Sequence, residues 1–214
     1  MNFRLDPAKT ALIVFDMIND FLLPGAPFES VRAREELVPR LKRLLAACRR
    51  KRMLIVYVGQ ANRPGGRDLG LVGEIYPALR EGRACVEGTP GVEVYKELAP
   101  QPEDIIIAKR RFDAFLGTDL EPILRQHQID TVIVTGTSTS VGTETTARAA
   151  VARDFRVIFP SDGTANRDLP DAGWGPVSQQ ELLRVVLTEL AQFCRTSSID
   201  DLIGELDGNV PRRE

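Results

Sequence analysis

The sequence has a single histidine and only three cysteines among its 214 residues. His127 stands in "RQHQ", within a helical pattern and away from the end of any predicted strand. A zinc site of the ordinary histidine and cysteine type is therefore hard to build, and a histidine-assisted nucleophile is nearly excluded. Cys48, Cys85 and Cys194 are far apart and odd in number, which is more typical of a reducing cytoplasm than of a disulfide framework. We expect a cytoplasmic protein that uses neither a metal nor another cofactor.

Long apolar runs and an excess of one charge are also missing. No apolar run reaches the roughly 18 residues that span a bilayer, and the first ten residues, "MNFRLDPAKT", hold no signal-peptide core. Charged residues make up 27% of the chain, yet the formal net charge is only −2. Bulk electrostatics therefore favour neither nucleic acid nor an anionic membrane as a partner. We expect the partner to be a small-molecule substrate.

Five apolar runs rich in β-branched residues recur along the chain and predict strands that are buried on both faces. They span residues 10–16, 53–58, 104–109, 130–136 and 155–160. Amphipathic helical patterns begin near residues 35, 118 and 178, and Thr118 and Glu121 have the spacing of a capping box. Strands that alternate with helices predict the α/β class, with a mainly parallel sheet covered on both faces. Without a repeat or linker, the length predicts one domain, 1–214.

The segment 60–103 is rich in glycine and proline and contains none of the clear helical patterns. It is too long for a plain connection between two elements of a compact domain. We therefore expect it to hold short helices and to form part of the wall of a site.

The ends of the predicted strands carry the candidate chemistry. Asp16, Gln60 and Lys109 each follow or end a strand, and the fourth strand runs into a turn of small residues. In open α/β sheets, sites form outside the carboxyl ends of the strands, so these groups are expected at one edge. A lone aspartate after a strand more often caps a turn, and a lone lysine is more often solvated. A buried aspartate beside a lysine, however, stays ionised and passes protons, and spacing alone leaves these alternatives about even.

The small-residue turn lies in "TGTSTSVGTETTARAA", residues 135–150. This strand, turn and helix arrangement is how many α/β enzymes present a nucleophile, or backbone N–H groups that hold a carboxylate or an oxyanion. The residue at the turn is Gly142, which has no side chain with which to attack. The same string equally fits a polar loop that caps a helix packed closely on the sheet.

Four segments give the chain its resemblance to the isochorismatase-like hydrolase superfamily. In order, they are "ALIVFDMINDFL", "EGTPGVEVYKELAP", "IIIAKRRFDAFLGTDLEPIL" and "VIVTGTSTSVGTETTARAA". The resemblance implies a Rossmann-like three-layer α/β/α sandwich around a parallel six-stranded sheet of strand order 3-2-1-4-5-6. Its cysteine-hydrolase branch uses an Asp–Lys–Cys triad, which falls on Asp16, Lys109 and Gly142. The chain thus resembles a branch that lacks the nucleophilic cysteine, and none of its own cysteines is expected at the edge of the site.

The resemblance also implies details of backbone and assembly. A cis peptide bond that does not involve proline is expected between Thr137 and Ser138. Members of the superfamily are commonly dimers or tetramers, so we expect a homodimer or a homotetramer. Residues 69–80, "LGLVGEIYPALR", are our candidate for the interface or for the pocket wall.

Isochorismatases proper also have glycine at the place of Gly142, and they carry a glutamine after the second strand that resembles Gln60 in "YVGQ". Their reaction needs no nucleophile, because an acid protonates a vinyl ether carbon and water adds to the oxocarbenium ion. Their elbow has Tyr-Ala-His where this chain has "STS" at 138–140, and "SDGTANRD" lacks their Asp-Phe-Ser pattern. In these respects the elbow looks more like that of a less characterised branch without cysteine.

Three functions remain open from the sequence. The first is vinyl ether hydrolysis with Asp16 as general acid, and the second is amide or ureide hydrolysis by water that Asp16 activates. The third is a catalytically silent member that binds a small acid or serves as an assembly subunit. The predicted catalytic residues are Asp16, Lys109 and Gly142. The predicted substrate-binding residues are Gln60, Arg111, Thr137 and Ser138.

Overall fold

The computed structural model describes residues 3–209. Within them a single sheet of seven strands runs through the molecule, and every pairing in it is parallel. The strands are β1 (Thr10–Phe15), β2 (Leu54–Gln60), β3 (Ile105–Lys109), β4 (Thr131–Thr137), β5 (Arg156–Pro160), β6 (Thr164–Ala165) and β7 (Arg195–Ser197). Residues 1–2 and 210–214 of the expected domain, 1–214, lie outside the described residues.

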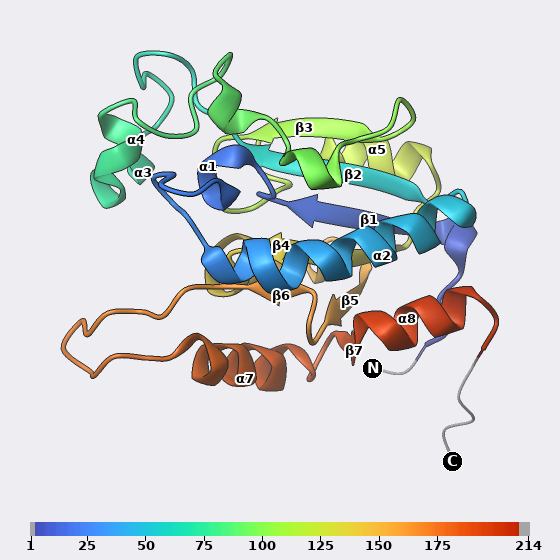
Figure 1. Ribbon diagram of the computed structural model, residues 1–214. Coiled ribbons are helices and arrows are strands. Elements are labelled where there is room, and N and C mark those ends of the chain that lie inside the picture. Colours follow the sequence, from blue (N-terminus) through green and yellow to red (C-terminus); the bar gives the residue numbers. More distant parts are fainter. Residues whose placement is uncertain (1–2, 210–214) are drawn as a thin grey trace.

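The strand order is β3-β2-β1-β4-β5-β7, with the two-residue β6 paired to the end of β4 (Figure 1). The predicted order 3-2-1-4-5-6 is confirmed, because β7 is the sixth strand of the main path. All five predicted strands are present. The sequence pattern did not reveal β6 and β7, which are too short to show a periodicity.

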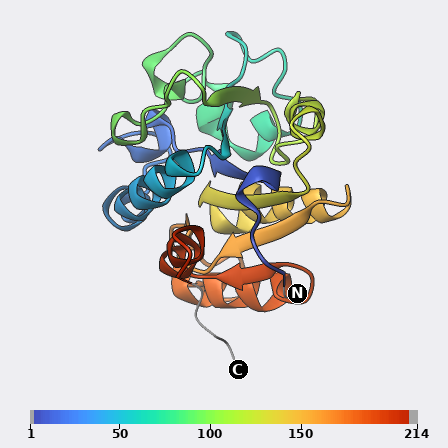
Figure 2. The ribbon, with the colours of Figure 1, turned by 90° about the vertical axis from the view of Figure 1, so that its right-hand side faces the viewer.

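Helices cover both faces of the sheet, as the predicted three-layer α/β/α sandwich requires (Figures 1 and 2). One face packs against α2 (Val38–Arg50) and α8 (Ile199–Leu206), and the other against α5 (Leu120–Gln126), α6 (Glu144–Val151) and α7 (Gln179–Leu190). Figure 2 shows α2 and α8 together on one side of the strands.

Strand β1 shows why the central strands are apolar throughout. Leu12 and Val14 pack into the core under α2 and α8, whereas Ile13 and Phe15 pack into the core on the opposite face. All six residues of β1 are buried. A strand covered by helices on both faces reads as a continuous apolar run rather than as an alternation.

Two helix starts differ in how well the sequence predicted them. Ser178 caps α7 with a complete capping box to Glu181, where the helical pattern begins. The expected capping box of Thr118 and Glu121 is wrong. Helix α5 begins at Leu120. The Thr118 hydroxyl accepts a hydrogen bond from the Leu120 N–H at 3.2 Å and donates one to a carbonyl in the preceding loop. The Glu121 carboxylate does not reach back to Thr118 but forms ion pairs with arginine side chains. His127 follows the end of α5 instead of lying within it.

The segment 60–103 forms short helices over the carboxyl ends of the strands, as expected. They include α3 (Val72–Ile75), α4 (Pro77–Arg80) and two single 3-10 turns at Pro90–Val92 and Lys96–Leu98. A separate apolar cluster joins this segment to α1 (Asn19–Leu22) and to the loop around it. The segment therefore has a core of its own beside the strand ends.

A second extension reaches from the same side of the molecule. Residues 166–177 leave β6 and return to α7 as an arm that projects from the body in Figure 1. Leu169 and Val177 exchange two backbone hydrogen bonds, of 2.9 and 3.1 Å, across this arm. We call residues 166–177 the arm below.

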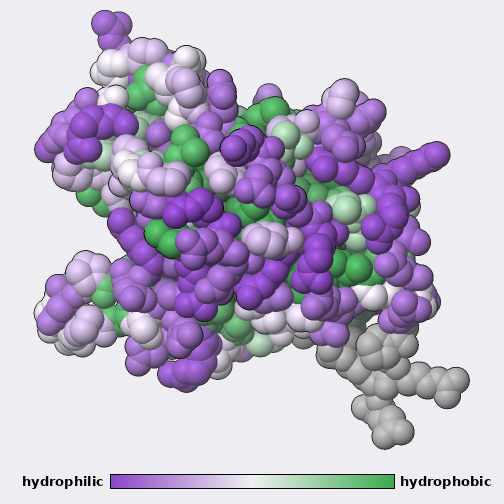
Figure 3. All heavy atoms as spheres, viewed as in Figure 1, coloured by the Kyte–Doolittle hydropathy of each residue, from purple (hydrophilic) through white to green (hydrophobic). Residues whose placement is uncertain are grey.

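One face of the surface is mostly polar. The face shown in Figure 3 is largely hydrophilic, with hydrophobic residues exposed in small separate areas. Among residues 3–209 no helix combines the length and the apolar character that crossing a membrane requires.

Candidate active site

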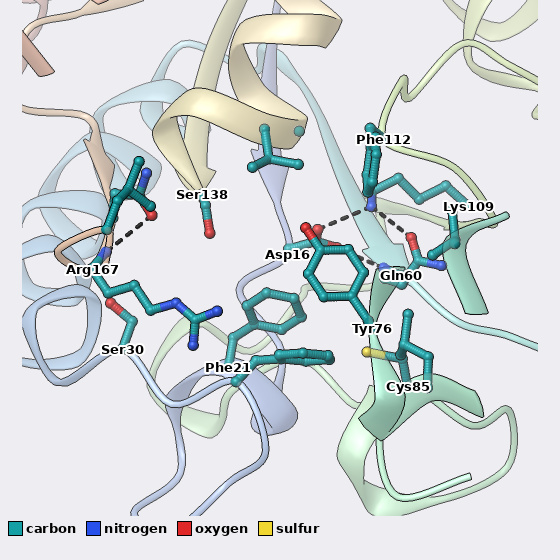
Figure 4. A pocket seen from close by; sticks show the side chains of 17 residues that line it. Asp16, Phe21, Ser30, Gln60, Tyr76, Cys85, Lys109, Phe112, Ser138 and Arg167 are labelled. Carbon is teal, nitrogen blue, oxygen red and sulfur yellow. Dashed lines mark hydrogen bonds and ion pairs between the residues drawn. The ribbon is translucent and has the colours of Figure 1, made fainter. Parts of the chain in front are cut away.

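A cavity of about 150 Å³ lies at the carboxyl ends of β1, β2, β3 and β4. Its lining includes Asp16, Gln60, Lys109, Ser138 and Gly142, and Figure 4 shows the polar side chains of this group around one space. The prediction that the strand ends converge on one pocket is confirmed. The reason is that these parallel strands all end at the same edge of the sheet.

Asp16 and Lys109 form a buried ion pair at the bottom of the site. The Lys109 Nζ lies 2.9 Å from the Asp16 Oδ2, and the two residues are only 2% and 5% exposed. Asp16 has a φ of 49°, a left-handed backbone that costs energy for a residue other than glycine, and such positions cluster at functional sites. Its N–H donates to the Val58 carbonyl, and its Oδ1 accepts from the Gln60 N–H at 2.6 Å. The carboxylate is therefore held by Gln60 of β2 and by Lys109 of β3.

Burial raises the pKa of the Asp16 carboxyl above its ordinary value. The Lys109 charge and hydrogen bond and the Gln60 N–H act in the opposite direction but are smaller effects. A carboxyl whose pKa moves up toward neutral pH is suited to give and take a proton during a reaction.

Gln60 and Asn62 hold Lys109 in place. The Lys109 Nζ donates to the Gln60 Oε1 at 3.0 Å, and the Gln60 Nε2 donates to the Asn62 Oδ1 at 2.9 Å. Both ends of the Gln60 amide are thus engaged within the protein, which favours a positioning role over direct substrate binding. The sequence did not single out Asn62, because it follows the end of β2 in a loop without a recognisable pattern.

The small-residue elbow has the expected form. Strand β4 ends at Thr137, the Thr137–Ser138 peptide bond is cis, and a π-helical turn, Thr139–Thr143, leads into α6. The Thr143 hydroxyl donates to the carbonyls of Ser138 and Thr139, at 3.1 and 2.9 Å. Ser138 and Gly142 both border the cavity.

Two predicted substrate-binding residues do not line the cavity. Arg111 turns away from it, because its Nη1 donates to the carbonyls of Asp68 and Arg110 at 2.9 and 2.8 Å. Thr137 is buried beside the site, with its hydroxyl 3.2 Å from that of Ser138. Arg111 therefore lies outside the lining of the cavity, since β3 ends at Lys109, and its part in substrate binding stays a prediction.

Aromatic side chains form one wall of the cavity. Phe21, Phe28, Tyr76 and Phe112 follow one another with ring centroids 5.3, 5.8 and 6.2 Å apart, and all four line the pocket. They come from three segments, one around α1, one between α3 and α4, and one after β3, so no local spacing predicts the wall. Tyr76 belongs to 69–80, which was expected to form an interface or this wall.

Cys85 also lines the cavity, so the expectation that no cysteine reaches the site is wrong. The segment 60–103 folds back over the strand ends, and Asn62 pairs with Val86 in a parallel bridge that brings Cys85 there. Burial and the nearby Asp16 and Asp20 carboxylates raise the pKa of the Cys85 thiol. A thiol with a raised pKa stays protonated at neutral pH and is a poor nucleophile.

Arg167, at the base of the arm, is a further residue that the sequence did not single out. It lines the cavity, and its side chain points toward the open space in Figure 4, across from Asp16 and Lys109. Its guanidinium has no hydrogen bond or ion pair with any residue between 3 and 209. Asn166 anchors the base of the arm, because its Nδ2 donates to the Ser140 Oγ at 2.9 Å. A free guanidinium in such a place is well suited to pair with a carboxylate.

A metal site has no counterpart in the described part of the chain. Residues 3–209 contain no group of three or more histidine, cysteine, aspartate or glutamate side chains that could hold a metal ion.

Comparison with known proteins places the chain among relatives of the same fold. A model of the isochorismatase domain matches residues 10–181. N-carbamoylsarcosine amidase from Arthrobacter sp. is 30% identical over 164 residues, which are 74% of this chain but only 60% of that relative. The structure of a cysteine hydrolase from Pseudomonas syringae pv. phaseolicola matches with a TM-score of 0.92, 33% identity and 97% coverage of both chains. That of N-carbamoylsarcosine amidase from Thermoplasma acidophilum matches with a TM-score of 0.72 and 27% identity, over 90% of this chain and 97% of that one.

The family model covers most of the sequence, including both members of the Asp16–Lys109 pair and the elbow at Gly142. The chain therefore belongs to the isochorismatase family of hydrolases.

Proposed function

We propose that the protein hydrolyses a C–N bond in a small amide or ureide that also carries a carboxylate. The observation that carries the proposal is one small cavity with the Asp16–Lys109 pair on one side and the free guanidinium of Arg167 on the other. The pair supplies proton transfer, and the guanidinium supplies a place for a carboxylate. Two relatives named N-carbamoylsarcosine amidase support the choice of the bond.

The proposed reaction proceeds without a covalent intermediate, because Gly142 offers no nucleophile. Asp16 accepts a proton from water as the water oxygen bonds to the substrate carbonyl carbon. The N–H groups of Ser138 and Gly142 hold the oxygen that becomes negative, and Lys109 keeps the carboxylate oriented. The C–N bond then breaks as the Asp16 proton passes to the nitrogen that leaves. Asp16 is restored as a carboxylate, and one water has been consumed.

Vinyl ether hydrolysis, which Sequence analysis named first, is the second candidate after C–N hydrolysis. The raised pKa of Asp16 favours it, because this reaction needs a carboxylic acid that holds its proton until it reaches the substrate carbon. Gln60 stands beside Lys109, in the place that the resemblance to isochorismatases implies. A silent binding protein or assembly subunit is the third candidate, since a buried ion pair also occurs in a purely structural role.

The deciding experiment incubates the protein with a panel of carboxylate-bearing ureides, amides and enol ethers. We expect ammonia or a free amine from a ureide or an amide, and no pyruvate from an enol ether. Asp16→Asn, purified alongside, shows whether a product comes from this site. Pyruvate release that depends on Asp16 would overturn the proposal in favour of the second candidate, and no turnover with any class would favour the third.

We also propose that the protein works in the cytoplasm and self-associates as a homodimer or a homotetramer. All three cysteines are free and buried, as in proteins of a reducing compartment. Leu71 and Ile75, within 69–80, are 67% and 49% exposed and lie next to inward-facing Val72 and Tyr76. Exposed aliphatic side chains beside a site wall suit a contact with a second copy.

A further inference from the structure

Phe15, the last residue of β1, packs against both Lys109 and Gly142 of the candidate site. It is fully buried and precedes Asp16 in the chain. The Lys109 Nζ lies 4.3 Å from the centroid of its ring, a distance at which a cation is attracted to the face of the ring. Phe15 therefore contacts one member of the catalytic pair and is bonded to the other through the backbone.

The same ring also excludes any side chain at position 142. A Cβ atom placed on Gly142 would overlap the Cε1 and Cζ atoms of Phe15 and lie 3.1 Å from its Cδ1. All three of the nearest atoms belong to this one ring. Overfilling a packed interior in this way forces neighbouring atoms out of place.

The backbone at Gly142 does not itself require glycine. Gly142 lies within the π-helical turn Thr139–Thr143 and is absent from the glycines with positive φ, unlike Gly136, whose φ is 118°. Every type of residue except proline adopts a helical backbone readily. The need for glycine at 142 thus arises from the Phe15 ring and not from the conformation of the turn.

We propose that Phe15 is a positioning residue that determines which chemistry this site performs. Its ring fills the room that a side chain at position 142 would need, so the elbow cannot present a nucleophile. It also covers the Lys109 ammonium from behind, which directs that charge toward Asp16 and keeps water away from the pair. The inference deepens the proposed function and rests on it for the reaction, whereas the steric exclusion stands by itself.

The steric part is tested by a stability cycle of four proteins, the wild type, Phe15→Val, Gly142→Ala and the double variant. We expect Gly142→Ala to lower the Tm by roughly 3–10 °C through overfilling, and Phe15→Val to lower it through a cavity. The fall in Tm of the double variant should be clearly smaller than the sum of the falls in the two single variants, because the new methyl group enters the space that the ring vacates. Additive losses, or a Gly142→Ala protein as stable as the wild type, would overturn the proposal.

Phe155→Val is the matched control. Phe155 is also buried and belongs to the core on the same face of the sheet, but it precedes β5 at the opposite end of the strands. Phe155→Val should lower the Tm, but it should not reduce the loss of Tm that Gly142→Ala causes. If Phe155→Val reduces the Tm loss of Gly142→Ala as much as Phe15→Val does, the effect does not depend on the space next to Gly142, and the proposal fails.

The chemical part is tested by a thiol placed at position 142. In Phe15→Val/Gly142→Cys we expect one more thiol to react with iodoacetamide than in Phe15→Val alone. The midpoint of its rate against pH should lie below the ordinary thiol value of about 8.5, because the Lys109 ammonium stands close. Gly142→Cys with Phe15 retained should show no such thiol. A reactive thiol of lowered pKa in that single variant would contradict the role given to Phe15.

The positioning role has its own readout in the titration of the Asp16 carboxyl, followed by NMR. Because burial raises this pKa, water that enters beside Lys109 in Phe15→Val should lower it toward the ordinary value. Phe155→Val should leave it unchanged, and an unchanged pKa in Phe15→Val would refute the shielding. None of these measurements uses a substrate, so a failure here is separate from a failure of the proposed reaction.

Discussion

Asp16 combines three properties in one side chain: it is buried, it has a cationic partner, and its backbone lies in the left-handed region. In Asp16→Asn the shape is kept and the Gln60 N–H still finds an oxygen, but no proton is transferred. We expect kcat to fall at least about 100-fold, since general acid–base help contributes about 10²–10⁴. Steady-state kinetics on the identified substrate measure this, with circular dichroism to show an unchanged fold. Full turnover by Asp16→Asn would rule out both enzymatic mechanisms.

The pH dependence of the reaction distinguishes the two mechanisms. If Asp16 acts first as a base, kcat/KM rises with pH through the raised pKa of Asp16, because only the carboxylate is active. If Asp16 acts first as an acid, kcat/KM falls across the same range. We expect the rising limb, at a pH above the ordinary aspartate value of about 3.9.

The pH dependence of the folded state's stability tests the direction of the Asp16 pKa shift independently. A raised pKa in the folded state means that the contribution of Asp16 is fully present below about pH 3.9 and is lost as the pH rises through the folded value. Relative to Asp16→Asn, the wild type should therefore lose stability in that range. Denaturation by urea at a series of pH values measures it, and a relative gain in stability would mean that Lys109 outweighs burial.

Cys85 lies in the pocket wall without the chemistry of a nucleophile. Its raised pKa keeps the thiol protonated, so Cys85→Ser should change kcat by no more than a few-fold. Iodoacetamide at pH 7 should leave turnover intact over the time of an assay. Loss of activity in Cys85→Ser to the level of Asp16→Asn would show instead that the thiol takes part in the reaction.

At the scale of elements, the arm of residues 166–177 brings a charge to the site. Arg167→Gln removes a cation that pairs with no other described side chain, so its loss should leave the fold undisturbed. We expect KM for a carboxylate substrate to rise roughly 10–100-fold, in line with about 1.5–3 kcal/mol for a charge-assisted hydrogen bond. Arg184→Gln, on the exposed side of α7, is the control for net charge.

A substrate analogue with a carboxamide in place of the carboxylate completes this test. This analogue should bind the wild type weakly, and its KM should hardly change in Arg167→Gln. If KM rises equally for both compounds, Arg167 shapes the pocket but does not recognise a carboxylate.

For the whole molecule, we expect self-association, which the single tryptophan helps to detect. Trp174 stands in the arm and is 95% exposed. Light scattering over a range of concentrations should give a mass at least twice the 23.7 kDa of one chain. A shift of the tryptophan emission to shorter wavelength with concentration would place the arm in the contact. A mass of one chain at every concentration would refute self-association.

Leu71→Asp locates the other candidate contact. Leu71 is exposed on the outer side of 69–80, whereas Val72 and Leu79 point into the pocket. The substitution should dissociate the assembly if this surface is the interface, and leave the Tm of the single chain within a few degrees of the wild type.

The sequence by itself determined the parallel sheet and the polar residues at the ends of its strands, and the resemblance implied the strand order. Buried parallel strands read as apolar β-branched runs, and the residue at the carboxyl end of such a run necessarily lies at the active edge of the sheet. This is why Asp16, Gln60 and Lys109 could be placed together at one edge from their positions in the chain, although those positions left their role open. The elbow and its cis bond were implied by the resemblance, whose motif includes Gly142.

Only the tertiary structure decided what surrounds that floor. Arg167, Cys85 and the aromatic wall come from loops whose conformation depends on packing against distant segments, and no periodicity records such contacts. For the same reason the sequence did not show that Arg111, two residues after the end of β3, lies outside the lining of the cavity. The sequence also did not show why residue 142 is glycine. The reason is the ring of Phe15, a residue more than a hundred positions away in the chain. Steric exclusion between two elements is visible only once both are placed in space.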